Sequence, residues 1–430
     1  MPASAVPTMS GLIARGAVTA AVRSDRLMAN TAWMCARGAV RIVLQAAYFV
    51  IVARVLGAAG YGEFIAVAAL AAMLAPFGSF GTGNLLVRDV SREPQAMADS
   101  WSTAMITTAL AGLVLTTTLV AVAAYVLPNA ALVLVALIGV ADLVFAQFSD
   151  LCGKAFQAQQ RLDVTATLDT VLSLAKLVAA VALYAVVATP TPLLWAWFYA
   201  AANGVAATIA LVVVFTRHRR LAVRGQFSLR SIKEGMYFAL SQWTQAVQKD
   251  IDKMLIVRFS GVHAAGIYGA AARIVDITFT PVLSLLSATY PGFFRHGAAG
   301  LQASVSFGRP LVVMAGLYGL VTGLALFLAA PLLPLVLGAS FEGSVHAVQC
   351  LAVLPFLRAL HYVAGDVLTG AGFQRWRAAL QILAGATAVV LALAVIPVYS
   401  WRGAAAVAVA SNVLLVAVSW IAIARLRRTA

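Results

Sequence analysis

Charged residues interrupt an apolar stretch near the middle of the chain. Residues 248–258 read QKDIDKMLIVR, and long apolar runs lie on both sides of them. A charge at mid-depth in a bilayer costs about 2.5–3.5 kcal/mol on insertion scales, so such a cluster needs polar surroundings. The sequence therefore predicts a polar cleft beside Lys249, Asp250, Asp252 and Lys253.

The composition explains why a bilayer is the relevant solvent. Hydrophobic residues make up 62% of the 430 residues, charged residues only 10%, and the mean hydropathy is +0.93. Soluble domains carry about 25% charged residues. We predict an all-α polytopic membrane protein with about 12 transmembrane helices of about 20 residues each. The expected spans are 31–56, 63–87, 99–127, 131–157, 164–188, 193–215, 232–259, 265–294, 309–337, 344–368, 376–397 and 403–424.

The basic residues behind the net charge of +15 are distributed as expected for a membrane topology. Most Lys and Arg residues fall in loops on one side, which the positive-inside rule assigns to the cytosol together with both termini. No nucleic-acid partner is therefore expected. Cys35, Cys152 and Cys350 lack metal-ligand spacing, so no metal or cofactor is expected either. The predicted domains are a basic N-terminal segment (1–30), an N-lobe (31–216), a basic cytosolic linker (217–231) and a C-lobe (232–430).

The two halves of the chain resemble each other. Arg54 matches Arg258 and Gly57 matches Gly261, both 204 positions apart, and the glycines of residues 60–62 match those of 266–269 after a small insertion. Two copies of six spans share one orientation and predict two pseudo-symmetric six-helix lobes around a central cleft, as in alternating-access transporters. Glycine tolerates positive φ angles and close backbone approach, so these glycines are expected to serve tight turns between spans.

Two stretches carry a family resemblance that extends over nearly the whole chain. ARVLGAAGYGEFIAVAALAAMLAPFGSFG and DIDKMLIVRFSGVHAAGIYGAAARIVD resemble the first and the seventh-to-eighth span hairpins of Wzx-type polysaccharide repeat-unit flippases. These flippases belong to the MATE-like multidrug/oligosaccharidyl-lipid/polysaccharide exporter superfamily. The resemblance implies a V-shaped cleft, the bacterial cytoplasmic (inner) membrane, and a polyprenyl-diphosphate-linked glycan as substrate. Membrane lipids and other polysaccharide-assembly membrane proteins are further expected partners. An aspartate-rich cation site, which some drug-exporting relatives have in the first span, is missing here.

The candidate site residues are intramembrane charges. Arg37, Arg41, Gln45 and Tyr48 share one face of the first span, and the 204-residue offset maps that face onto the span that holds the QKDIDK cluster. Structural ion pairs are an alternative interpretation for Asp250 with Lys253, Arg273 with Asp276, Lys176 with Asp169, and Arg358 with its neighbours His361 and Asp366. Asp142, the least paired acid, is a candidate for ion coupling. The candidate substrate-binding residues are Arg37, Arg41, Lys249, Asp252, Lys253, Arg273 and Arg358.

We therefore expect a transporter that flips a lipid-linked oligosaccharide repeat unit from the cytosolic to the outer leaflet by alternating access. An ion-coupled antiporter of drugs or other small molecules with the same fold is the first alternative. A membrane-embedded polysaccharide-assembly enzyme is the second, and it is disfavoured because the predicted outer loops are short and lack a carboxylate pair. No catalytic residue is expected.

Overall fold

The computed structural model describes the backbone of residues 9–127, 130–218 and 228–429, and side chains from residue 40 onwards except at 92, 241, 291 and 429. Every regular element in these residues is helical. The first half consists of α1 (Met9–Leu74), η1 (Ala75–Phe77), α2 (Thr82–Arg92), η2 (Pro94–Ala96), α3 (Met97–Val126), α4 (Leu132–Gly139), η3 (Val140–Phe145), α5 (Ala146–Ala158), α6 (Leu162–Val186) and α7 (Pro192–Arg217). The second half consists of α8 (Leu229–Gly297), α9 (Leu301–Ala329), η4 (Ala330–Leu332), α10 (Leu333–Leu337), η5 (Ala339–Phe341), α11 (Gly343–Leu351), α12 (Leu354–Gly370) and α13 (Gln374–Thr429).

Twelve membrane crossings are present in the described residues. Within the part of the chain that the structure describes, nine apolar helical stretches are long enough to span a bilayer. Three of these stretches, within α1, α8 and α13, contain a non-helical residue at which the helix reverses, so each supplies two crossings. The twelve-helix fold predicted from the sequence is thereby confirmed.

The helix reversals occur where the backbone leaves the helical region. Gly57 has φ 66° and ψ 175°, and Gly261 has φ 85° and ψ 169°, a combination that is essentially restricted to glycine. These two angles confirm the predicted turn role of both glycines and their equivalence in the two halves. In α13 the reversal falls at Ser400, with φ 57°.

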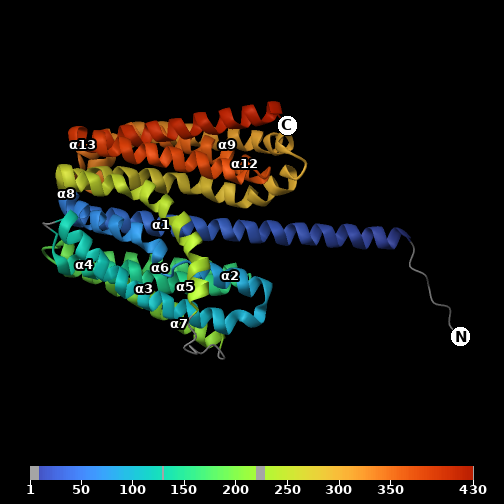
Figure 1. Cartoon of the computed structure of the whole chain (residues 1–430), viewed down its shortest axis with the longest axis horizontal. Coiled ribbons are helices and arrows are strands. Elements are labelled where there is room, and N and C mark those ends of the chain that lie inside the picture. Colours follow the sequence, from blue (N-terminus) through green and yellow to red (C-terminus); the bar gives the residue numbers. More distant parts are fainter. Residues whose placement is uncertain (1–8, 128–129, 219–227, 430) are drawn as a thin grey trace.

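The helices form two lobes that lie side by side (Figure 1). Helices α1–α7, drawn from blue to green, make the N-lobe, and most of α8–α13, drawn from yellow to red, makes the C-lobe. We call the end where α1 begins and α13 finishes the terminal end, and the end that carries the reversals of α1, α8 and α13 the hairpin end. The first turns of α8 lie against the N-lobe, where Glu234 accepts a hydrogen bond from Arg88 at 3.1 Å.

The lobes meet at the hairpin end through two reciprocal glycine contacts. A Cβ atom added to Gly62 would lie 1.8 Å from the carbonyl oxygen of Val262, and one added to Gly266 would lie 1.9 Å from that of Ala58. Both pairs are related by the 204-residue offset, which therefore continues through the hairpins. The alignment predicted from the sequence, with an insertion between residues 60–62 and 266–269, is wrong: Gly62, not Gly60, corresponds to Gly266.

Polar contacts reinforce this junction from the C-lobe. The Arg54 guanidinium donates to the carbonyl oxygens of Leu335 and Val336 at 3.2 and 3.4 Å, and the Ala58 amide donates to the Ser340 hydroxyl at 3.1 Å. The first contact supplies a partner for carbonyls at the C-terminus of α10. The hairpin end is therefore closed.

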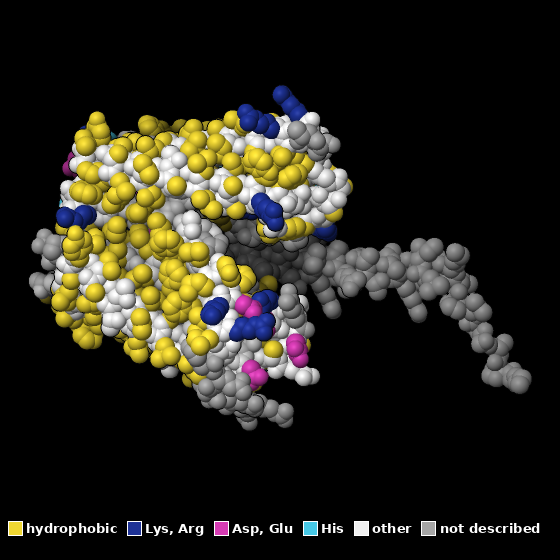
Figure 2. All heavy atoms as spheres, viewed as in Figure 1, with side chains coloured by type: hydrophobic (Ala, Val, Ile, Leu, Met, Phe, Trp, Pro, Cys, Tyr) yellow, Lys and Arg dark blue, Asp and Glu magenta, His cyan; other side chains and the backbone are white. Residues whose placement is uncertain are grey.

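The surface has the distribution expected for a protein surrounded by lipid. Hydrophobic side chains cover most of the face in Figure 2, and the surface is hollowed between the lobes toward the terminal end. Large exposed apolar residues such as Leu113, Val178 and Leu328 would be unfavourable in water, and they are favourable against acyl chains. The protein is therefore a multi-pass membrane protein.

Candidate functional site

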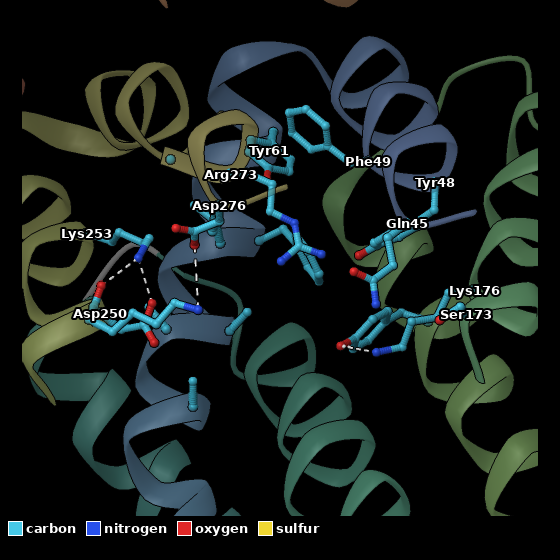
Figure 3. A pocket seen from close by; sticks show the side chains of 18 of the residues that line it. Gln45, Tyr48, Phe49, Tyr61, Ser173, Lys176, Asp250, Lys253, Arg273 and Asp276 are labelled. Atoms are coloured by element: carbon cyan, nitrogen blue, oxygen red, sulfur yellow. Dashed lines mark hydrogen bonds and ion pairs between the residues drawn. The ribbon is translucent and has the colours of Figure 1, made fainter. Parts of the chain in front are cut away.

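A cavity lies between the two lobes and has a volume of about 330 Å³. Helices α1, α6 and α7 form its N-lobe wall, and α8 forms its C-lobe wall (Figure 3). The N-lobe wall consists of Gln45, Tyr48, Phe49, Tyr61, Phe64, Ile65, Ala68, Ala69, Ala72, Leu172, Ser173, Lys176 and Tyr199, and the C-lobe wall of Lys249, Asp250, Lys253, Gly269, Arg273 and Asp276.

Arg273 is the cation most available to a ligand. Its side chain extends into the middle of the cavity in Figure 3. Among the described residues it has no hydrogen bond or ion pair, so its guanidinium donors remain free. The predicted local pair with Asp276 does not form. A partly desolvated guanidinium is well suited to bind carboxylate or phosphate oxygens in a bidentate manner.

Asp276 instead links two other cations. It accepts a hydrogen bond from Arg358 of α12 at 2.7 Å, and the Lys249 ammonium lies 3.6 Å from its second oxygen. The Lys249 side chain is 62% exposed, whereas that of Asp276 is 23% exposed. Arg358 therefore neutralises Asp276 and does not pair with Asp366, which is bound by Arg377 at 3.2 Å. Lys249 is held only loosely and can turn toward a ligand.

The charges of the QKDIDK cluster largely neutralise one another. Lys253 donates to Asp250 at 2.6 Å, which confirms the predicted local pair, and lies 3.8 Å from Asp252. Asp252 also accepts hydrogen bonds from the Tyr268 hydroxyl and from the Lys253 amide. Asp252 is not among the residues that line the cavity, so it fixes Lys253 and Tyr268 from behind.

The N-lobe wall holds a second, partly buried network that the sequence did not reveal. Lys176 donates to the Tyr199 hydroxyl at 3.1 Å, and this hydroxyl donates to Asp142 at 2.7 Å. Asp142 lies in η3, a π-helical segment of the kind frequently found at functional sites. Asp142 is therefore not the least paired acid, and Lys176 does not pair with Asp169. Tyr199 is the linking residue, and no sequence pattern singled it out.

The polar face predicted on the first span is only partly in the cavity. Gln45 and Tyr48 line it, whereas Arg41 forms an ion pair with Asp169 of α6 at 2.9 Å outside it. The side chain of Arg37 lies outside the described residues. Of the seven predicted substrate-binding residues, the structure brings Lys249, Lys253 and Arg273 to the cavity, and it places Arg41, Asp252 and Arg358 beside or behind it.

The sequence and fold were compared with known proteins. The profile of the family described as polysaccharide biosynthesis protein matches residues 27–296, and none of the curated proteins matches. A multidrug resistance MATE transporter of the MOP superfamily in an inward-facing conformation is similar with a TM-score of 0.75 and 14% identity, over 91% of this chain and 99% of that one. An outward-facing counterpart has a TM-score of 0.60 and 14% identity, over 92% and 96% of the two chains.

A third structure is a MOP superfamily transporter from Pyrococcus furiosus, described as having a binding pocket of reverse polarity that suggests a different function. Its TM-score is 0.60 at 15% identity, over 91% of this chain and 94% of that one. At such identities the likeness establishes the fold. The family match covers more than half of the chain, and the similar solved structures with this fold are transporters. The chain belongs to the polysaccharide biosynthesis protein family, and its twelve-helix, two-lobed fold is similar to that of MATE transporters of the MOP superfamily.

Proposed function

We propose that this transporter flips a polyprenyl-diphosphate-linked oligosaccharide repeat unit across the bacterial cytoplasmic membrane for surface or exopolysaccharide synthesis. The proposal is supported most directly by Arg273, a cation without a counter-ion among the described residues, at the centre of a cavity between the lobes. A diphosphate that leaves water needs charge-assisted donors, and Arg273 together with the loosely held Lys249 can supply them.

The geometry also suggests the direction of access. The lobes are joined at the hairpin end and hollowed toward the terminal end, and the inward-facing relative has the higher TM-score of the two conformations compared. The basic loops at the terminal end favour the cytosol for that side and for both termini. In this proposal the diphosphate and glycan enter between the lobes from the cytosolic leaflet, and the prenyl tail stays in lipid. Separation of the hairpin contacts then exposes the cavity to the outer side.

An ion-coupled small-molecule antiporter is the second candidate, because similar solved structures include multidrug transporters. A coupling role for Asp142 would fit either candidate. A cationic drug could pack against the aromatic wall, but Arg273, unpaired among the described residues, would repel it across the small cavity. The charges therefore favour an anionic substrate.

Substitution of Arg273 tests the proposed function. Arg273→Gln should insert normally yet lower glycan export by about 10- to 150-fold, which corresponds to the 1.5–3 kcal/mol of a hydrogen bond to a charged group. Arg258→Gln is the matched control, because Arg258 lies on the same helix, is exposed, and does not line the cavity. Equal export by both variants at matched protein levels would contradict the proposal.

A further inference from the structure

The two walls of the cavity differ in charge at positions that are equivalent in the repeat. The 204-residue offset that relates the hairpin contacts also pairs cavity residues across the lobes. Five such pairs line the cavity, and in four of them the N-lobe residue is uncharged and the C-lobe residue is charged. These four are Gln45 with Lys249, Phe49 with Lys253, Ala69 with Arg273, and Ala72 with Asp276; the fifth, Ile65 with Gly269, has no charge on either side.

The N-lobe wall offers neutral hydrogen-bonding groups beside rigid rings. Within the described part of the chain, the Gln45 amide and the Tyr48 hydroxyl have no hydrogen-bond partner. Tyr48 packs against Trp195 with ring centroids 5.8 Å apart, and Phe64 packs against Tyr199 at 5.3 Å. Ala69 and Ala72 line the same wall, and their small side chains take up little of the cavity. Such a wall suits an uncharged sugar. Aromatic rings can pack against the apolar face of a pyranose, and a neighbouring amide and hydroxyl can form hydrogen bonds with its OH groups.

Among the described residues, the only cation of the N-lobe wall is Lys176, and it is directed into its own lobe. Lys176 donates to Tyr199 and lies 4.6 Å from the centre of its ring, and the network ends on the Asp142 carboxylate. This wall therefore has little charge to offer an anion. The C-lobe wall is the opposite case, because Arg273 is unpaired among the described residues and Lys249 is held at 3.6 Å.

From this asymmetry we infer that the lobes divide the substrate between them: the C-lobe wall binds the diphosphate through Arg273 and Lys249, and the N-lobe wall binds the first, uncharged sugar through Gln45 and Tyr48. Figure 3 shows Arg273 between the charged cluster on one side and Gln45, Tyr48 and Lys176 on the other. The inference rests on the proposed function. It assigns Gln45 and Tyr48 as specificity-determining residues for the glycan.

A ligand that carries a diphosphate but no sugar distinguishes the roles of the two walls. Purified protein in lipid nanodiscs is titrated with farnesyl diphosphate, and glycan export is measured in cells for the same variants. Arg273→Gln should weaken the binding of farnesyl diphosphate at least about tenfold. The double variant Gln45→Ala/Tyr48→Phe should bind farnesyl diphosphate within about twofold of the wild type and yet export about tenfold less glycan.

Two results would overturn the division between the walls. One is a loss of affinity for farnesyl diphosphate in the double variant that is as large as the loss in Arg273→Gln. The other is export of glycan by the double variant at the wild-type rate. If the double variant does not fold, Gln45→Leu alone replaces it, because leucine is of similar size and lacks only the amide. Unchanged binding of farnesyl diphosphate by Arg273→Gln has a separate meaning: it would refute the diphosphate site and with it the proposed function.

Discussion

The glycine contact at the hairpin end gives a prediction about the equilibrium between the two access states. In Gly62→Ala the new Cβ would lie 1.8 Å from the Val262 carbonyl oxygen, and ordinary contact begins at 3.4 Å. The lobes would therefore have to separate locally by about 1.6 Å, the difference between these distances. Because the neighbour is backbone, it cannot move aside as a flexible side chain does.

The free-energy cost follows from the behaviour of overpacked interfaces. Overpacking of a tight contact costs about 1–3 kcal/mol. If the contact exists only while the hairpin end is closed, the whole cost falls on the closed state. The ratio of open to closed molecules should then rise by about 5- to 150-fold.

Spin labels can measure this shift. Ala59 and His263 are exposed at the hairpin end, one on each lobe and 204 positions apart. Labels are attached there in a background without the native cysteines, and the distance distribution between them is recorded by double electron–electron resonance. Gly62→Ala should add or enlarge a longer-distance population, and Gly266→Ala, whose Cβ would lie 1.9 Å from the Ala58 oxygen, should act alike.

Gly323→Ala is the matched control for the label experiment. Its Cβ would lie 2.3 Å from the Ala352 carbonyl oxygen, but this contact is between helices of the C-lobe alone. It should therefore lower the thermal stability without changing the distance distribution. An unchanged distribution in Gly62→Ala, or an equal shift in Gly323→Ala, would show that the Gly62 contact does not hold the hairpin end closed.

Three further predictions concern stability and topology. Gly57→Val should lower the amount of folded protein in the membrane, because valine cannot adopt φ 66° without strain; a normal amount with lost transport would point to a substrate contact instead. Asp276→Asn should lower the melting temperature, since Arg358, with a side chain 25% exposed, loses its counter-ion at a cost of about 1–3 kcal/mol; an unchanged melting temperature would show that solvent already screens the pair. Cysteine labels at Ala59 should react only from outside and labels at Gly300 only from the cytosol; the reverse pattern would invert the proposed topology.

Local backbone features could be predicted well from the sequence. The breaks at Gly57 and Gly261 follow from residue type and from the repeat, and the twelve apolar spans follow from their length. The insertion placed between the hairpin glycines was wrong because short glycine motifs align in more than one way. The reciprocal contacts of Gly62 and Gly266 show that the 204-residue offset continues through the hairpins without an insertion.

Side-chain pairing was harder to predict, because it depends on how each helix is rotated against helices that are distant in sequence. Asp250 and Lys253 lie one turn apart, so their pair was foreseeable. Asp276 with Arg358, and Arg41 with Asp169, join different helices, and local spacing suggested other partners. Tyr199 links Lys176 to Asp142 through a hydroxyl, and a tyrosine in an apolar helix gives no sequence signal of such a role.

Translocation by the purified protein is the direct test of whether it flips a lipid-linked glycan. The transporter is reconstituted into liposomes that contain polyprenyl-diphosphate-linked oligosaccharide extracted from the native cells. Exposure of the glycan on each side is followed with a glycan-cleaving enzyme added outside. Wild-type protein should make the glycan of the inner leaflet accessible, Arg258→Gln should do the same, and Arg273→Gln should do so at least about tenfold more slowly. Liposomes whose inner-leaflet glycan stays protected with wild-type protein, or equal rates for the two arginine variants, would contradict the proposed function.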